Sequence, residues 1–445
     1  MDELLAKIVS LSKRKGFIFP ASDIYGGMAG FYDYGPLGSE LKNNIKKAWW
    51  KEMVQKRKKV VGIDGAVITH PRVWEASGHI ENFSDPMVDC KGCHKRFRAD
   101  HLVEALGKTA YSLEDLKKCL EGEKCPECGG ELTEPRPFHL LMKTGLGVIE
   151  GKKADAYLRG EACQSIYLNY HNVLQSSRQK IPFGIAQIGK AFRNEITPKN
   201  FILRQREFEQ WDLQWFIKPE TAKEWFEYWK NERMNWYKSL VNNPENIRFR
   251  EHDKDELAHY AKTAFDIEYK TSFGWKEWEG VHWRGDWDLS RHGEFSGNDF
   301  TYTDDEGDSF IPWVIETSGG VDRTFLFLLL DAYHEEEIEG EKRVVLKFRP
   351  DLSPVKVAVL PLVKNKSVIV DKAQEVYDLL NEDFNIQYDQ TGSIGRRYRR
   401  QDEIGTYNCI TVDFDTLKDD SVTIRDRNSM EQKRIKIKDI LEQKI

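Results

Sequence analysis

The chain has 445 residues, of which 40% are hydrophobic and 31% charged, which is typical of a globular protein with two or three domains. Acidic residues (73) outnumber basic ones (67), so a nucleic-acid partner must be met by local basic patches rather than by a general positive field. No run approaches the roughly 18 apolar residues that a membrane span needs, and the acidic N-terminus is unlike a signal peptide. We therefore expect a cytoplasmic, enzyme-sized protein with no membrane partner.

Helical and extended patterns alternate along the first part of the chain. The N-terminal segment places its apolar residues on one helical face, and apolar residues at every fourth position predict a longer helix over 39–55. The β-branched run 60–69 predicts a strand that ends at Pro71, because proline cannot donate to a sheet. Residues 85–137 carry two C-x-x-C pairs and are interpreted as an insertion.

The middle of the chain mixes both kinds of element. Several strands are predicted between 138 and 216, including 165–170 and 185–188. A composition rich in Trp, Glu and Lys predicts helix within 219–262. A strand, a glycine turn and an apolar helix follow one another at 314–333. These segments predict one unit that contains both sheet and helices.

The pattern changes after RPDLSP at 349–354, where the prolines disfavour helix and mark a boundary. Beyond it the sequence predicts strands at 355–360, 385–388 and 409–414 and helices at 370–380 and 394–404. This alternation indicates a separate α/β domain of about a hundred residues.

Two cysteine pairs have the spacing of a metal site. Cys90 with Cys93 and Cys125 with Cys128 supply four thiolates from two tight turns, which suits a structural zinc. The long separation between the pairs implies a small subdomain around them. The alternative is a degenerate site with reduced, unliganded cysteines. The isolated Cys163 and Cys409 are interpreted as small core residues.

Two other segments resemble known motifs, but each lacks a required residue. Gly184–Lys190 has the G-x-x-x-x-G-K spacing of a P-loop, but Ala191 stands where a hydroxyl would hold magnesium. Asp255–His259 lacks the first histidine of a zinc-protease helix. His252 and His259 are therefore interpreted as structural.

The segment FRNEITPKNFILRQREFEQWDLQWF at 192–216 has two different sides when it is extended. Leu203 and the tryptophans share one side, whereas Arg204, Arg206 and Phe208 share the other. It is either a solvated strand or the floor of a site for a flat, anionic ligand. In Gly319-Gly-Val-Asp-Arg323, glycines permit close backbone approach and a helix start offers N–H groups to phosphate. The alternative there is a tight turn with a surface arginine.

These segments resemble the three motifs of class II aminoacyl-tRNA synthetases: the helix and strand that end at Pro71 resemble motif 1, FRNE through REFEQ motif 2, and GVDR motif 3. Other stretches are similar to the homodimeric glycyl-tRNA synthetases, and the resemblance spans the whole chain. They are SDIYGG at 22–27, DYGPLGSELKNNIKKAWW at 33–50, PRVWEASGHIENFSDP at 71–86, FRADH at 97–101, HDKDELAHY at 252–260, FGWKEWEG at 273–280 and GSIGRRYRRQDEIGT at 392–406.

The resemblance implies an α+β fold, with a class II antiparallel sheet flanked by helices. It implies an N-terminal part of the catalytic domain with motif 1 at 1–84, a zinc-binding insertion at 85–137, a catalytic core with motifs 2 and 3 at 138–345 and a C-terminal α/β anticodon-binding domain at 350–445. Motif 1 further implies a two-fold homodimer.

The implied reaction has two steps. Glycine attacks the α-phosphate of ATP to give glycyl-adenylate, and the terminal ribose of tRNA(Gly) then takes the glycyl group. Such transfers need aligned reactants and neutralised charge more than a protein nucleophile. The resemblance assigns the catalytic roles to Arg193, Glu195 and Arg323, and magnesium to Glu277, whose alternative is a surface carboxylate.

The resemblance also implies the ligand sites, with Arg193 on the α-phosphate and adenine between Phe208 and Arg323. The ATP-binding set is Arg193, Asn194, Glu195, Leu203, Arg204, Arg206, Glu207, Phe208, Glu277, Trp278, Gly320, Val321, Asp322 and Arg323. The glycine-binding set is Arg98, Glu161, Phe208, Glu209, Gln210, Trp211, Asp212, Arg284, Glu316, Thr317, Ser318, Gly319 and Gly320. Within it, Arg284 is expected at the carboxylate and Glu161, Glu316 and Ser318 around the ammonium. Either acid, taken alone, is more often a solvated or paired carboxylate.

The chain departs from the family pattern around glycine. Arg159-Gly-Glu-Ala-Cys-Gln-Ser165 stands for R-P-E-T-A-Q-G, Glu316-Thr-Ser318 for E-P-S, and FEQWD, ending at Asp212, for F-E-Q-M-E. The acids survive, so we expect a glycine site whose affinity differs from the family's.

A basic cluster in the C-terminal domain is the implied tRNA contact. It consists of Arg396, Arg397, Tyr398, Arg399 and Arg400. Arginines suit phosphates and an aromatic ring suits an unpaired base, although a solvated helix face has the same pattern. Two rival functions stay open: an adenylate-forming enzyme with an acceptor other than tRNA, and a catalytically inactive nucleic-acid-binding accessory subunit.

Overall fold

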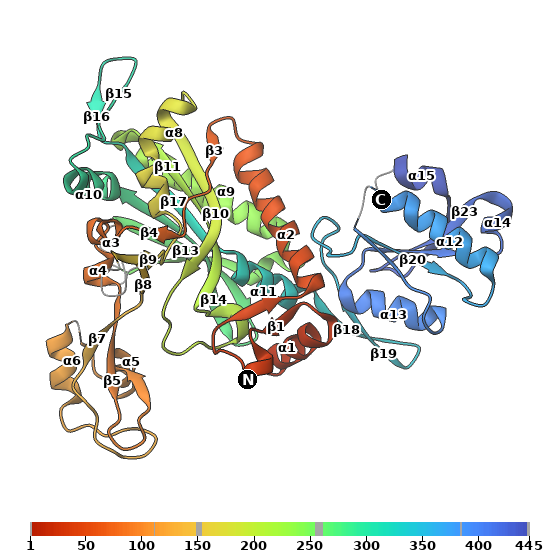
Figure 1. The fold of residues 1–445 in the computed structure, drawn as a ribbon, viewed down its shortest axis with the longest axis horizontal. Coiled ribbons are helices and arrows are strands. Elements are labelled where there is room, and N and C mark those ends of the chain that lie inside the picture. Colours follow the sequence, from red (N-terminus) through yellow and green to blue (C-terminus); the bar gives the residue numbers. More distant parts are fainter. Residues whose placement is uncertain (1, 111, 148–153, 254–260, 383–384, 443–445) are drawn as a thin grey trace.

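The computed structural model describes residues 2–110, 112–147, 154–253, 261–382 and 385–442. Figure 1 shows a large central unit, a small extension around α5 and α6, and a C-terminal unit on the other side of the centre. The segment HDKDELAHY at 252–260, with His259, lies almost entirely outside the described residues; His252 is described and its Nε2 lies 2.9 Å from Asp266. No helix in the described ranges combines the length and apolar character needed to cross a bilayer.

A seven-stranded sheet forms the central unit. Its order is β12 (Ile247–Glu251), β13 (Thr263–Thr271), β14 (Gly274–Gly285), β17 (Trp313–Gly320), β11 (Glu207–Ile217), β10 (Phe183–Phe192) and β3 (Val60–Gly62). Neighbours pair antiparallel except β3 with β10. The expected antiparallel sheet is therefore confirmed. Because residues 184–190 lie inside β10, the rejection of a P-loop is confirmed too.

Long helices cover one face of this sheet. They are α1 (Glu3–Lys15), α2 (Pro36–Trp50, continued by a π-helical turn Lys51–Gln55), α9 (Ala222–Leu240) and α11 (Val321–Ala332). The odd positions of β11 face them: the Trp211 ring stacks on Trp49 at 5.5 Å and Trp215 meets Trp229 edge-on at 5.4 Å. Almost all of α11 is buried, which explains its apolar sequence.

The other face of the sheet is only partly covered. Short helices pack over one end of it: α7 (Gln164–Leu168), α8 (Tyr170–Ser176) and α10 (Trp287–Ser296). They enclose a second apolar cluster that includes Tyr170, Phe216 and Leu289. The even positions of β11 and β17 beyond this cluster form the floor of the site described below. They are polar except for Phe208 and Gly320.

Two sequence predictions of strands are wrong. The run 60–69 forms only β3 and β4 (Ile68–Thr69), and Pro71 begins α3 (Pro71–Ala76) instead of ending a strand. Residues 165–170 form α7 and the start of α8. Residues 164–167 are all buried, and a short segment buried on every side has no periodicity that separates helix from strand.

The extension has its own small core. Its sheet has the order β6 (Arg96–Arg98), β5 (Ser84–Asp89), β7 (Arg136–His139), and α5 (Ala99–Ala105) and α6 (Leu113–Leu120) pack on it. A second three-stranded sheet, in the order β4, β9 (Ala154–Leu158), β8 (Met142–Leu146), lies beside it. Shorter elements are β1 (Ile18–Pro20), β2 (Tyr32–Tyr34), α4 (His79–Asn82), β15 (Tyr302–Thr303) and β16 (Ser309–Phe310).

The C-terminal unit confirms the predicted alternation and adds to it. Its sheet order is β21 (Ile386–Tyr388), β20 (Val357–Pro361), β22 (Asn408–Val412), β23 (Ser421–Asp426) and β24 (Gln432–Lys436). Its helices are α12 (Ser367–Leu380), α13 (Ile394–Ile404), α14 (Thr416–Asp419) and α15 (Ile437–Glu442). It docks on the hairpin of β18 (Tyr333–Ile338) and β19 (Glu341–Leu346), where Arg343 Nε donates to Asp402 Oδ2 at 2.9 Å.

The tryptophan at 211 has a structural role on the helix-covered face. Its Nε1 donates to Glu279 Oε2 at 3.0 Å, and Tyr237 and Arg233 bind the same buried carboxylate. We expect Trp211→Phe to lower the free energy of unfolding by about 1–3 kcal/mol more than ring shrinkage alone, because a buried charge loses a donor. The matched control in urea unfolding is Trp229→Phe, whose indole nitrogen has no hydrogen-bond partner among the described residues. Equal losses in both variants would contradict a contribution from the Glu279 hydrogen bond.

Candidate active site

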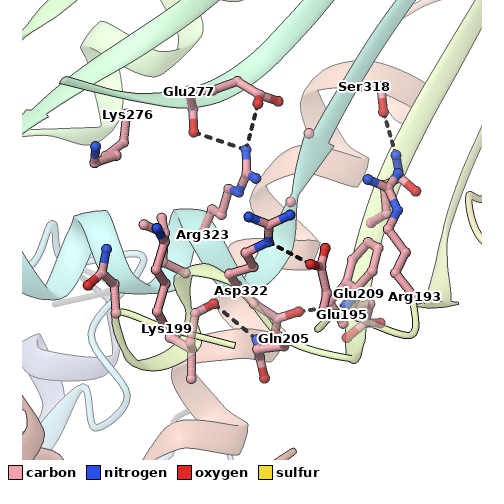
Figure 2. Close-up of a pocket in the computed structure, with 18 residues that line it drawn as sticks. Arg193, Glu195, Lys199, Gln205, Glu209, Lys276, Glu277, Ser318, Asp322 and Arg323 are labelled. Carbon is pink, nitrogen blue, oxygen red and sulfur yellow. Dashed lines mark hydrogen bonds and ion pairs between the residues drawn. The ribbon is translucent and has the colours of Figure 1, made fainter. Parts of the chain in front are cut away.

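A cavity of about 430 Å³ opens where β11 and β17 meet the N-terminus of α11 (Figure 2). It is lined by Arg193, Glu195, Lys199, Asn200, Ile202, Leu203, Arg204, Gln205, Phe208, Glu209, Gln210, Lys276, Glu277, Ser318, Gly319, Gly320, Asp322 and Arg323. The segments that the sequence singled out at 192–216 and 319–323 therefore meet in one place.

Arg193 is held over an aromatic surface. Its guanidinium carbon lies 5.3 Å from the Phe208 ring centroid and 5.1 Å from that of Phe83. Its Nε donates to the carbonyl of Gly160 at 3.0 Å. These contacts orient one cation at the cavity wall, next to a ring that is suited to stacking a flat ligand.

Arg323 occupies the opposite wall, at the first turn of α11. Its Nη1 lies 3.0 Å from Glu277 Oε2 and donates to the Glu277 carbonyl at 3.3 Å. The Arg323 charge lowers the pKa of Glu277. An arginine here adds its charge to the free N–H groups of the helix start, which favours an anionic ligand.

The expected position of Trp278 beside the nucleotide is not supported. Its side chain is fully buried on the helix-covered face, where Nε1 donates to Thr324 Oγ1 at 2.8 Å and the ring packs against Phe327. Glu277 faces the cavity and the next residue, Trp278, faces the core, as the alternation of side chains along a strand requires.

Some other members of the expected ATP set lie beside the cavity without lining it. Arg204 is an exception, since it lines the cavity and pairs with Glu195 at 2.6 Å. Arg206 turns away and donates to the carbonyls of Glu195 and Ala29. Glu207 pairs with Lys190 at 2.8 Å. Asn194 donates its main-chain N–H to Leu140, and Val321 is buried in the core.

Five lining residues were missed from the sequence: Lys199, Asn200, Ile202, Gln205 and Lys276. The first four belong to the segment between β10 and β11, where Asn200 has φ 58°. The turn-forming T-P-K-N at 197–200 was the available signal for a loop that folds over a site.

Three carboxylates cluster deeper on the same face of the sheet. Glu161, Asp212 and Glu316 are all buried. Gln210, which lines the cavity, donates to Ser318 Oγ at 2.7 Å, and Gln214 donates to Glu316 Oε1 at 2.8 Å. Such a cluster of buried acids favours a cation.

Arg284 belongs to this cluster. Its Nη1 lies 3.0 Å from Glu316 Oε2, and its Nε and Nη2 donate to the two oxygens of Asp288 at 2.8 and 2.9 Å. Arg284 thus holds Glu316 in place in this structure. Its expected role at the glycine carboxylate stays a prediction.

The surroundings of the three acids shift their pKa values in different directions. Burial opposes ionisation of Glu316, but the Arg284 charge and His282 outweigh it and lower the pKa to about 2. Burial likewise opposes ionisation of Glu161, yet His79, 3.2 Å away, holds its pKa well below the usual value. Burial and the Glu316 charge raise the pKa of Asp212 well above the usual range.

Four other members of the expected glycine set direct their side chains to other parts of the structure. Trp211 and Thr317 are buried on the helix-covered face. Arg98 pairs with Asp85 at 2.9 Å and Asp100 at 2.5 Å within the extension. Glu209 lines the cavity, but its carboxylate points to Lys42 at 3.1 Å. Period-two alternation explains Trp211 and Thr317, since their even-numbered neighbours face the site.

The extension contains the expected four-cysteine cluster. The sulfur atoms of Cys90, Cys93, Cys125 and Cys128 all lie within 4.8 Å of one another. The main-chain N–H groups of Cys93 and Gly92 donate to Cys90 Sγ at 3.4 and 3.3 Å and lower the pKa of that thiol to about 6. Four thiols this close, with thiolate-stabilising N–H groups, fit a tetrahedral zinc. Cys163 and Cys409 are buried core residues, as predicted.

The basic cluster of α13 is less exposed than the sequence indicated. Arg397 is buried and donates to the Gly392 carbonyl at 2.7 Å, while the Tyr398 ring packs under Arg425. Arg400 binds Asp389 through two nitrogens, and Arg399 lies 3.9 Å from Asp402. Of these five residues, only Arg396 is exposed to solvent over much of its surface. The expectation of five RNA-facing residues is corrected, because a helix packed on a sheet turns some of its side chains inward.

Comparison with known proteins agrees with this geometry. A model of the tRNA synthetase class II core domain (G, H, P, S and T) matches residues 148–333, and an anticodon binding domain model matches 356–443. The chain thus combines the core of a class II aminoacyl-tRNA synthetase with an anticodon-binding domain. Proteins named "Glycine--tRNA ligase" from Treponema denticola and Acetivibrio thermocellus are each 52% identical to it, over 97% and 99% of this chain and 94% and 98% of their own. One from Clostridium acetobutylicum is 52% identical over 100% of this chain and 99% of its own. The chain belongs to the glycine-tRNA ligase family.

Proposed function

We propose that this protein is a glycine-tRNA ligase that forms glycyl-adenylate from glycine and ATP and then transfers the glycyl group to the 3′ end of tRNA(Gly). The observation that carries the proposal is the convergence of Arg193, Phe208 and Arg323 on one cavity, with buried carboxylates behind it. A nucleotide and an amino acid meet at the border between these two regions.

ATP occupies the cavity of Figure 2. Adenine stacks between Phe208 and Arg323, and Arg193 neutralises the charge that grows on the α-phosphate as the carboxylate oxygen attacks and pyrophosphate leaves. Lys199 and Lys276 on the cavity wall add positive charge for the outer phosphates. Glu195 orients Arg204, with which it is paired at 2.6 Å.

Magnesium arrives with ATP as part of the substrate. Glu277 is the proposed acid for it, because its side chain is half exposed at the cavity wall and its pKa is lowered by Arg323. Oxygen donors are what magnesium prefers. Arg323, which holds this carboxylate in the absence of nucleotide, then turns to the base and the phosphates.

Glycine enters with its ammonium toward Asp212, Glu161 and Glu316. Selection is by exclusion: the space is closed by buried polar side chains, including Tyr167, whose hydroxyl donates to Gln214 at 2.6 Å. A larger amino acid would place apolar carbon against buried carboxylates, which is unfavourable. In the second step the ribose hydroxyl attacks the activated carbonyl, and AMP leaves with the bonding electrons.

The division of labour along the chain is part of the proposal. Residues 1–84 and 138–345 form the catalytic domain, 85–137 the zinc-binding insertion and 350–445 the tRNA-reading domain. The close agreement of 85–137 with the sheet of β5, β6 and β7 supports the insertion. We further infer a homodimer through the motif 1 region and a cytoplasmic location, where tRNA and ATP are at hand.

The deciding experiment is glycine-dependent exchange of pyrophosphate into ATP by the purified chain, followed by charging of tRNA(Gly). Both activities are expected. Exchange without charging of any tRNA would favour an adenylate-forming enzyme with another acceptor. Binding of tRNA with neither activity would favour the accessory-subunit alternative.

The zinc site gives a separate prediction. We expect Cys125→Ser to lower bound zinc from about one per chain to near zero, because structural zinc needs all four thiolates. Exchange activity should stay within about threefold, since the part of the extension around α5 and α6 projects away from the central unit (Figure 1). Metal analysis and exchange assays measure these outcomes. The matched control is Cys119→Ser, a cysteine of the same extension outside the cluster, which should keep its zinc.

A further inference from the structure

A buried ionic network lies beside the nucleotide cavity, on the helix-covered face of the sheet. Lys42 of α2 places its Nζ 2.7 Å from Asp322 Oδ1 and 3.1 Å from Glu209 Oε2. Lys46, one helical turn further on, lies 3.1 Å from the other oxygen of Glu209. The Lys42 side chain is only 8% exposed and that of Asp322 only 4%. The network thus pairs two cations with two anions, and Lys42 and Asp322 are its most buried members.

Three separate segments meet at this network. Asp322 Oδ2 accepts the main-chain N–H of Glu209 at 2.6 Å, and Tyr34 of β2 donates to Oδ1. Asp322 sits in the first turn of α11 and Glu209 near the start of β11. Lys42 therefore joins α2 to both elements that form the walls of the cavity.

The acids that Lys42 holds are the chain neighbours of the proposed adenine-binding groups. Asp322 precedes Arg323, and Glu209 follows Phe208. The distance between β11 and the start of α11 decides whether a flat base fits between the Phe208 ring and the Arg323 guanidinium. Lys42 is the one described cation within 4 Å of both acids.

The charge balance explains why Lys42 is suited to this task. Burial disfavours its charge, but the carboxylates of Asp322 and Glu209 outweigh burial and raise the pKa of Lys42. The same contacts lower the pKa of Asp322 against its own burial. Without Lys42, two buried acids would repel each other with too few cations, and the start of α11 would shift relative to β11.

We propose that Lys42 is a positioning residue for ATP: it fixes the N-terminus of α11 against β11, so that Arg323 and Phe208 keep the separation that a base requires. The inference rests on the proposed function only in placing adenine between those two side chains. Because Lys42 belongs to α2, it also links the proposed dimer-forming helix to the nucleotide site.

The test is Lys42→Met, which keeps the length of the side chain and removes its charge. We expect the KM for ATP in glycine-dependent exchange to rise about tenfold to a hundredfold, as misplacement of binding groups by about 1 Å does. The KM for glycine should change less than about threefold, because the buried acids that surround glycine lie on the opposite face of the sheet from the Lys42 network. The matched control is Lys47→Met, an exposed lysine of the same helix, which should leave both constants unchanged. An unchanged KM for ATP, or equal changes in both constants, would overturn the proposal.

A double-variant cycle separates positioning from loss of folding. Asp322→Asn, Lys42→Met and their combination are compared, with rates normalised to the folded fraction measured by circular dichroism. If Lys42 acts through Asp322, the combined variant binds ATP about as well as the weaker single variant. Independent, multiplying losses would overturn the proposal.

Failure of the proposed function gives a different result. Absence of exchange activity in the wild-type chain would contradict the glycine-tRNA ligase proposal. Calorimetry of ATP binding to wild type and to Lys42→Met would then test the role of Lys42 directly. Weaker ATP binding by Lys42→Met than by wild type supports the positioning role. Equal affinities, or no ATP binding by wild type, overturn it.

Discussion

Glycine-dependent exchange of pyrophosphate into ATP should fall by about a thousandfold when Arg193 is replaced by alanine. Arg193 is the cation that lies against Phe208 at the cavity wall, and its Nε is anchored to the Gly160 carbonyl at 3.0 Å. A group held in advance where charge develops stabilises the transition state without reorganisation, so its removal lowers kcat more than it raises KM. Exchange kinetics at varied ATP concentrations measure both constants.

The control for this variant is Arg72→Ala, which removes an exposed arginine whose Nη2 donates to the Phe295 carbonyl, away from the cavity. It should keep wild-type exchange. Thermal unfolding and zinc content of Arg193→Ala should match wild type, because the Arg193 side chain faces the cavity rather than the core. A folded Arg193→Ala protein with exchange within tenfold of wild type would remove Arg193 from the proposed mechanism.

Local periodicity was a good guide to long elements and a poor one to short, buried segments. The apolar face of α2 is readable because only one side of that helix is buried, and α11 is readable because it is apolar over most of its length. Residues 164–167 are buried on every side, so the helix α7 looked like a strand. The strands β23 and β24 were not predicted, because they follow residue 414, where the last predicted element ends.

The candidate site was predictable where chemistry and spacing coincide in one segment. Arg193, Phe208 and Arg323 were assigned from short motifs, and all three line the cavity. Direction was harder to predict than identity. The inward turn of Arg397 depends on tertiary packing, so the sequence could not reveal that this side chain faces away from solvent.

The departures from the family pattern receive different explanations. Trp211 stands where the family has methionine, and its indole adds a donor to the buried Glu279 while its ring stacks on Trp49. That substitution concerns the helix-covered face and not glycine. Asp212 stands on the opposite side of the same strand, among the acids that are proposed to hold the ammonium.

Asp212→Asn should make the protein more stable at neutral pH while weakening glycine binding. Neither Asp212 oxygen has a hydrogen-bond partner among the described residues by distance and angle, although nearby Ser318 and Arg159 favour its charge. Burial and Glu316 outweigh them and raise its pKa well above the ordinary value of 3.8. The amide removes the burial cost of ionisation. Because asparagine cannot ionise when the ammonium of glycine binds, the KM for glycine should rise about tenfold to a hundredfold, as expected when a charge-assisted hydrogen bond is lost.

The raised pKa of Asp212 determines how the free energy of unfolding changes with pH. A group whose pKa is raised on folding favours the folded state below its unfolded pKa, and this contribution is lost as pH rises through the folded pKa. The stability gain of Asp212→Asn over wild type should therefore be near zero below about pH 4, and should exceed about 1.4 kcal/mol at pH 8, the equivalent of one pKa unit. Urea unfolding at both pH values measures it. The matched control is Asp288→Asn, a buried acid that binds Arg284 through both oxygens and should lose stability at pH 8. A loss of stability in Asp212→Asn at pH 8 would show instead that this carboxylate is paired and ionised in the free protein.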